Sequence, residues 1–116
     1  MSMSELLRWQ WNGYARYHRS RTNLLLHIVV VPLFLAGNVG LVLALVTGSW
    51  LFAAVSLGAM VVSVALQGRG HEHEPVPPEP FSNPVNAVSR LFLEQWVTFP
   101  RFVVSGAWWH ALRTAR

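Results

Sequence analysis

Two long apolar runs dominate the first half of the chain. The first covers residues 24–46 and contains no formally charged side chain, and the second covers residues 50–66. Only Thr47, Gly48 and Ser49 separate them. A helix needs about 20 mostly apolar residues to cross a bilayer. The pattern therefore predicts two transmembrane helices joined as a hairpin.

Arginine residues flank this hairpin, whereas its turn is uncharged. Arg8, Arg16, Arg19 and Arg21 precede the first run and Arg69 follows the second. Basic residues next to membrane helices collect on the cytoplasmic side. We expect an integral membrane protein, of a bacterial inner membrane, with both termini in the cytoplasm.

The segments outside the hairpin mix apolar and polar residues. Residues 1–22 combine Trp, Tyr and Arg, which is typical of a helix in the headgroup zone of a bilayer. Residues 68–84 are predicted to form a polar loop. Residues 85–112 are apolar in patches, which predicts amphipathic helices that lie on the membrane or pack against the hairpin.

A third membrane crossing in the last segment is disfavoured. Arg90, Glu94 and Arg101 recur along it, and charges inside a bilayer are costly. Pro100 bends or breaks the helix. The predicted fold is therefore an all-α membrane protein in a single domain, residues 1–116, with a transmembrane hairpin and amphipathic or re-entrant C-terminal helices.

The composition restricts the chemistry. The chain has no Cys, Lys or Asp, so thiolate nucleophiles, cysteine-ligated metals, lysine Schiff bases and Ser-His-Asp triads are excluded. Catalysis would have to use His and Glu, which favours a bound metal. The formal charge is +4, but no basic stripe with interleaved aromatic residues is present, so nucleic acid is not an expected partner.

Four of the five histidines are brought to one end of the hairpin by this topology. His27 lies near the start of the first run, and His71 and His73 follow the second. His18 precedes His27 by nine residues, so one straight helix would point the two rings in opposite directions. The two rings can share a site if the chain bends at residues 19–22. The fifth histidine, near the C-terminus, is expected at the membrane interface.

The polar stretch at residues 68–80, GRGHEHEPVPPEP, allows two arrangements besides that of a solvated connector. In an extended chain His71 and His73 share one side, whereas in a last helical turn His71 pairs with Glu74. The glycines and Pro75 favour the extended form. Imidazole and carboxylate ligands without sulfur suit Fe(II), Mn or Zn.

The order of these residues resembles a known family of small multi-pass membrane proteins. The first motif, in YARYHRSRTNLLLHIVVVP, consists of Tyr14, His18, Asn23, His27 and Pro32. The second, in LQGRGHEHEPVPP, consists of Gln67, Gly70, His71, Glu74 and Pro77 or Pro78. The fungal member of that family is an iron(II)-dependent dioxygenase of the endoplasmic reticulum, which shortens a 2-hydroxy fatty acid by one carbon during phytosphingosine degradation.

The resemblance implies a catalytic iron site. His18, His27 and His71 are expected to hold Fe(II), with His73 or Glu74 completing the ligand set. The substrates implied are a 2-hydroxy fatty acid, taken from the membrane, and O2.

Three further residues, Arg21, Asn23 and Arg69, are expected to contact the substrate, the arginines by pairing with its carboxylate. Two other functions stay open. One is a zinc-dependent membrane lipid hydrolase with Glu74 as its base, and the other is a non-catalytic membrane protein that binds lipid or a protein partner. A homo-oligomer also stays open.

Overall fold

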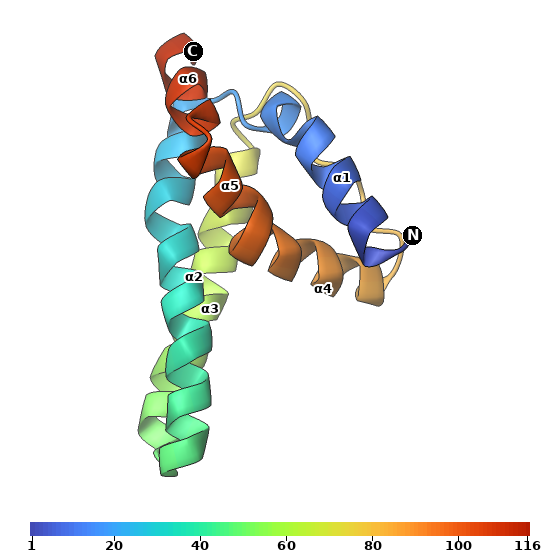
Figure 1. Ribbon diagram of the computed structural model, residues 1–116. Coiled ribbons are helices and arrows are strands. Elements are labelled where there is room, and N and C mark those ends of the chain that lie inside the picture. Colours follow the sequence, from blue (N-terminus) through green and yellow to red (C-terminus); the bar gives the residue numbers. More distant parts are fainter.

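The two apolar runs form the two longest helices of the computed structural model, which describes residues 1–116 (Figure 1). Helix α2 covers Arg21–Thr47 and helix α3 covers Trp50–His71. Each helix is capped at its N-terminus by a serine, Ser20 for α2 and Ser49 for α3. The serine hydroxyl accepts a hydrogen bond from the backbone N–H group three residues later. The predicted hairpin is confirmed, and both helices are long and apolar enough to cross a membrane.

Close contact between α2 and α3 depends on small residues. A Cβ added at Gly37 would lie 2.7 Å from the Met60 side chain, and one added at Gly40 would lie 2.5 Å from the Ser56 hydroxyl. Near the turn, large apolar side chains instead point outward. They include Val42, Leu43, Leu45, Val46, Trp50 and Leu51. The turn end of the hairpin extends well beyond all other helices (Figure 1).

The remaining elements are short helices at the other end of the hairpin. They are α1 (Met3–Tyr14), the 3₁₀ turn η1 (Ala15–Tyr17), α4 (Pro84–Leu93), the π-helical segment η2 (Glu94–Thr98), α5 (Phe99–Val104) and α6 (Ala107–Thr114). The chain contains no strand, so the all-α prediction is confirmed. In Figure 1, α1 and α4 project to one side of the hairpin and approach each other at their outer ends.

The C-terminal helices pack against the hairpin, one of the two arrangements expected. The buried core joins Tyr14 of α1, Leu24 and Val31 of α2, and Phe99 and Phe102 of α5. The indole nitrogen of Trp108 in α6 also donates a hydrogen bond to the Leu24 carbonyl, at 3.1 Å. This core fixes α1 and α5 on the same face of α2.

One expectation about local structure is wrong. Helix α3 continues through the glycines to His71, so the polar loop begins at Glu72 and His71 is helical, not extended. The glycine at position 70 has a packing role here, because a Cβ on Gly70 would overlap the side-chain oxygen of Asn23. Glycine costs a helix about 1 kcal/mol relative to alanine, and the close approach to α2 offsets that cost.

Candidate metal centre

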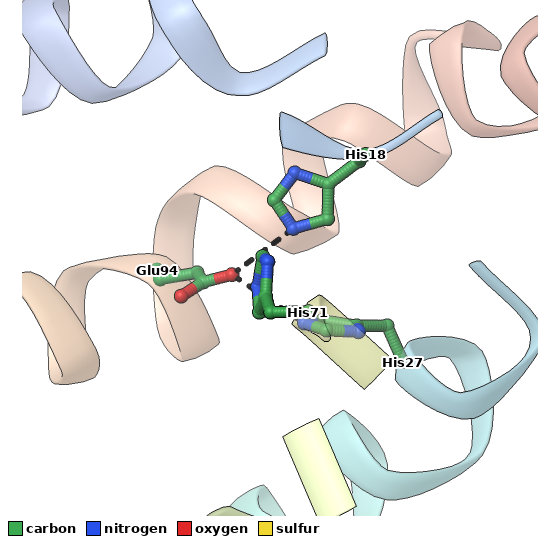
Figure 2. A group of neighbouring side chains, drawn as sticks. All are labelled: His18, His27, His71 and Glu94. Carbon is green, nitrogen blue, oxygen red and sulfur yellow. Dashed lines mark ion pairs between the residues drawn. The ribbon is translucent and has the colours of Figure 1, made fainter. Parts of the chain in front are cut away.

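Three imidazole rings meet between the segment that follows η1, the start of α2 and the end of α3 (Figure 2). His18 lies in the break between η1 and α2, His27 in the second turn of α2, and His71 at the end of α3. The ring centroids are 5.0 Å apart for His18 and His27, 4.9 Å for His18 and His71, and 5.1 Å for His27 and His71. The bend expected between His18 and His27 is present, and it lets both rings point to one place.

Two of these rings are oriented by backbone carbonyls one helical turn earlier. His18 Nδ1 donates to the Tyr14 carbonyl at 2.8 Å, and His27 Nδ1 donates to the Asn23 carbonyl at 3.0 Å. A carbonyl can only accept, so Nδ1 carries the proton and Nε2 carries the lone pair. Both Nε2 atoms are buried without a hydrogen-bond partner. Metal-ligating histidines characteristically have this arrangement.

Glu94, the first residue of η2, adds a carboxylate to the three rings. Its Oε2 lies 3.6 Å from His18 Nε2 and 3.8 Å from His27 Nε2 (Figure 2). The Tyr14 hydroxyl donates a hydrogen bond to the same oxygen at 2.7 Å. Burial raises the pKa of Glu94, whereas the positive charge of a protonated His18 or His27 ring and the hydrogen bond from the Tyr14 hydroxyl lower it, and the net pKa is about 2. The carboxylate is therefore charged.

These four side chains fit a metal ion. One ligand atom from each of His18, His27, His71 and Glu94 lies within 4.8 Å of the others. A buried imidazole nitrogen without a partner is costly unless something binds it. Three imidazoles and one carboxylate, without sulfur, are a donor set that suits Fe(II) or Zn.

The π-helical segment holds Glu94 in position. Gln95 is fully buried, and its side-chain amide exchanges two hydrogen bonds with that of Gln67 on α3, both at 2.8 Å. Thr98 donates to the side chain of Gln10 on α1. Local π-helical turns occur often at functional sites. Here the segment is anchored to α3 and to α1, so the Glu94 carboxylate is directed between them.

A cavity of about 730 Å³ opens next to the cluster, between α1, α3, α4 and the loop after α3. His18, His71 and Glu94 form part of its wall, whereas His27 lies outside it. Pockets that bind small molecules have volumes of roughly 300–1,000 Å³. The candidate metal centre is therefore open to a ligand from one side.

Arg90 fastens the loop that closes this cavity. Its guanidinium donates to the carbonyls of Glu79, at 2.8 Å, and Pro80, at 3.2 Å. It also lies 4.4 Å from the centre of the Phe81 ring and 5.0 Å from that of Trp9. A cation over an aromatic face is stabilised by the ring. Arg90 thus ties the loop and α1 to α4.

A family model described as 2-hydroxy-palmitic acid dioxygenase Mpo1-like matches residues 4–106. The chain belongs to the Mpo1-like family. The matched region contains His18, His27, His71 and Glu94. The family resemblance expected from the sequence is confirmed. Searches of curated proteins and of solved structures found no match.

Neither residue expected to complete the ligand set of this Mpo1-like chain lies in the cluster. His73 is exposed on the loop after α3. Glu74 instead accepts hydrogen bonds at the start of α2, from the backbone N–H groups of Arg19 (2.8 Å) and Ser20 (3.0 Å) and from the Asn23 side chain (2.7 Å). A carboxylate at a helix N-terminus is favourable. Glu74 therefore joins the three segments that carry His18, His27 and His71.

None of the three residues expected to contact the substrate lines the cavity. Arg21 and Arg69 are exposed and do not line the cavity. Asn23 is fully buried. Its backbone carbonyl accepts the hydrogen bond from His27, and its side-chain amide donates one to Glu74. Glu94 was not among the expected ligands, although a lone carboxylate in the apolar sequence LFLEQW was a usable signal, since such groups are rarely placed in apolar helices without a function.

Proposed function

We propose that this protein is a membrane-embedded, non-haem Fe(II)-dependent dioxygenase that shortens 2-hydroxy fatty acids by one carbon. The observation that carries the proposal is the pair of unpartnered, buried Nε2 atoms of His18 and His27, facing the carboxylate of Glu94 at the edge of a cavity. Membership of a family named for 2-hydroxy-palmitic acid dioxygenase supports the choice of reaction.

In this proposal His18, His27, His71 and Glu94 hold the metal. Iron(II), when bound, supplies the binding and activation of O2, which none of the side chains in this cavity can provide. Tyr14 keeps the Glu94 carboxylate in place through its hydroxyl and stacks on the His18 ring, with centroids 3.8 Å apart. The cavity admits the hydroxyl and carboxyl end of the fatty acid beside His18, His71 and Glu94.

The exposed apolar surface of α2 and α3 supports insertion of the hairpin into a membrane. The turn end is then immersed in lipid, and the cluster end lies near the membrane surface, on the cytoplasmic side if the arginine pattern sets the orientation. A fatty acid dissolved in the bilayer would reach the cavity without leaving the membrane environment.

The test is reconstitution of the detergent-purified protein with Fe(II) under anaerobic conditions, followed by 2-hydroxypalmitate and O2. We expect consumption of O2 and formation of the fatty acid shorter by one carbon, and no product from protein loaded with Zn. If iron is bound but no 2-hydroxy acid of any chain length is shortened, the proposed activity is wrong.

Two other functions have less support. A zinc-dependent lipid hydrolase would use Glu74 as its base, but both Glu74 oxygens accept hydrogen bonds at the start of α2. A non-catalytic lipid-binding protein would have no need for three converging imidazoles. Metal analysis and dependence on O2 separate both from the oxygenase.

A further inference from the structure

One face of α3 forms a continuous wall of the cavity. Val64, Gln67, Gly68 and His71 all line it, at the spacing of one stripe along a helix. Seven residues at about 1.5 Å each separate Val64 from His71 by about 10 Å along the axis. The wall is polar at the cluster end and apolar at the other.

A second part of the wall, formed by helices that project sideways from the hairpin (Figure 1), also changes from polar to apolar. Glu94 belongs to the cluster, and Leu91, about one turn earlier on α4, also lines the cavity. One turn beyond each apolar end, the next side chains are exposed valines, Val61 on α3 and Val88 on α4. The apolar end of the cavity therefore lies beside the exposed apolar surface of the protein.

Gly68 leaves this wall open at its middle. A Cβ added there meets no atom within 4 Å, in contrast to Gly70, two residues on. Any side chain at position 68 would extend into free space on the wall between the cluster and Val64.

We propose that an acyl chain lies in this cavity with its polar end at His71 and its tail over Gly68 towards Val64 and the membrane. Gly68 is then the position that sets specificity for long chains, because a bulky side chain there would extend into the path. The proposal rests on the proposed function for the identity of the polar end, a 2-hydroxy acid. Its central claim, the direction and path of the chain, concerns binding alone.

The absence of cysteine from the natural sequence allows a direct test. Gly68→Cys places one thiol on the proposed path. Gly58→Cys is the matched control, because Gly58 is also on α3 and also faces open space but does not line the cavity. Both variants, loaded with metal in detergent, are treated with a maleimide in the presence of 2-hydroxypalmitate or of 2-hydroxypropanoate, whose single methyl group is too short to reach position 68 from His71.

We expect 2-hydroxypalmitate at ten times its dissociation constant to slow labelling of Gly68→Cys about tenfold, since only the free fraction reacts. Labelling of Gly58→Cys stays unchanged, and the short acid protects neither position. Equal labelling of Gly68→Cys with and without the long acid, when binding is shown by equilibrium dialysis, overturns the proposal. Protection by the short acid overturns it as well, because the head would then lie at Gly68.

A bulky substitution gives a second, independent measurement. In Gly68→Phe we expect kcat/KM for 2-hydroxypalmitate to fall about tenfold or more relative to that for 2-hydroxypropanoate, whereas Gly58→Phe keeps the wild-type ratio. Equal loss for both acids contradicts the path. If the wild type turns over neither acid, the proposed function fails, and the labelling experiment still decides whether the chain binds along Gly68.

Discussion

The carboxylate of Glu74 lies 2.7 Å from the side-chain nitrogen of Asn23, fifty-one residues away in sequence. The backbone carbonyl of Asn23 in turn accepts the hydrogen bond that orients His27. Glu74 follows His71 by three residues, and its other partners, Arg19 and Ser20, directly follow His18. This one carboxylate therefore connects all three segments that supply an imidazole.

We expect Glu74→Gln to weaken metal binding without removing a ligand. The amide places an N–H group where the carboxylate accepts, and loss of a supporting contact to a metal ligand typically costs about 10–100-fold in affinity. Titration of the apoprotein with Fe(II) measures the change. Glu72→Gln is the control, because Glu72 is exposed on the same loop and its substitution is expected to leave affinity unchanged. Equal affinities for the two variants contradict this role of Glu74.

Two glycines of the same helix are expected to respond oppositely to alanine. Gly70→Ala puts a methyl group into the Asn23 side chain and should lower the free energy of unfolding by about 1–3 kcal/mol. Gly68→Ala meets no atom within 4 Å and should raise it by up to about 1 kcal/mol, because alanine favours the helix. Denaturation of both variants in the same detergent measures the difference. A stable Gly70→Ala would show that α2 and α3 approach less closely than described.

Tyr14 is expected to act on the metal centre through Glu94. Tyr14→Phe keeps the ring that stacks on His18 but removes the hydroxyl that donates to the carboxylate at 2.7 Å. Metal affinity should fall about tenfold, as for other residues that support a ligand. Tyr17→Phe serves as the control, since the Tyr17 hydroxyl makes no hydrogen bond to Glu94. The same affinity in both variants would mean that Tyr14 contributes packing only.

The paired amides of Gln67 and Gln95 offer a test of how η2 is held. Replacing one by Leu leaves the other buried without its partner, which costs about 1–3 kcal/mol, whereas replacing both removes the unpaired group. We expect the double variant to be more stable than the sum of the single effects predicts. Urea denaturation of the four proteins gives the coupling energy, and simple additivity would contradict the pairing.

The sequence was sufficient to predict the hairpin and to predict that His18, His27 and His71 lie close together. Apolar run length determines the hairpin, and the hairpin topology then places these histidines at one end. Glu94 could not be placed in the same way, because its position depends on how α4 and η2 return to the hairpin through Gln95 and Gln67. That packing leaves no periodic signal in the sequence.

The role of Glu74 was beyond prediction for a related reason. Its spacing from His71 is that of a shared helical face, which suggested a fourth ligand. The helix ends at His71, however, and the carboxylate reaches the unpaired N–H groups at the start of α2. Free backbone donors of a helix N-terminus compete for a carboxylate, and their position depends on the tertiary fold.

Elemental analysis of the purified protein tests the metal centre most directly. We expect a stoichiometric amount of iron after anaerobic loading and dialysis, lost in His27→Ala and in Glu94→Ala. His73→Ala and His110→Ala should keep it, because both histidines are exposed outside the cluster. Absence of bound metal from the folded wild type, or equal iron in His27→Ala and His73→Ala, would contradict the account.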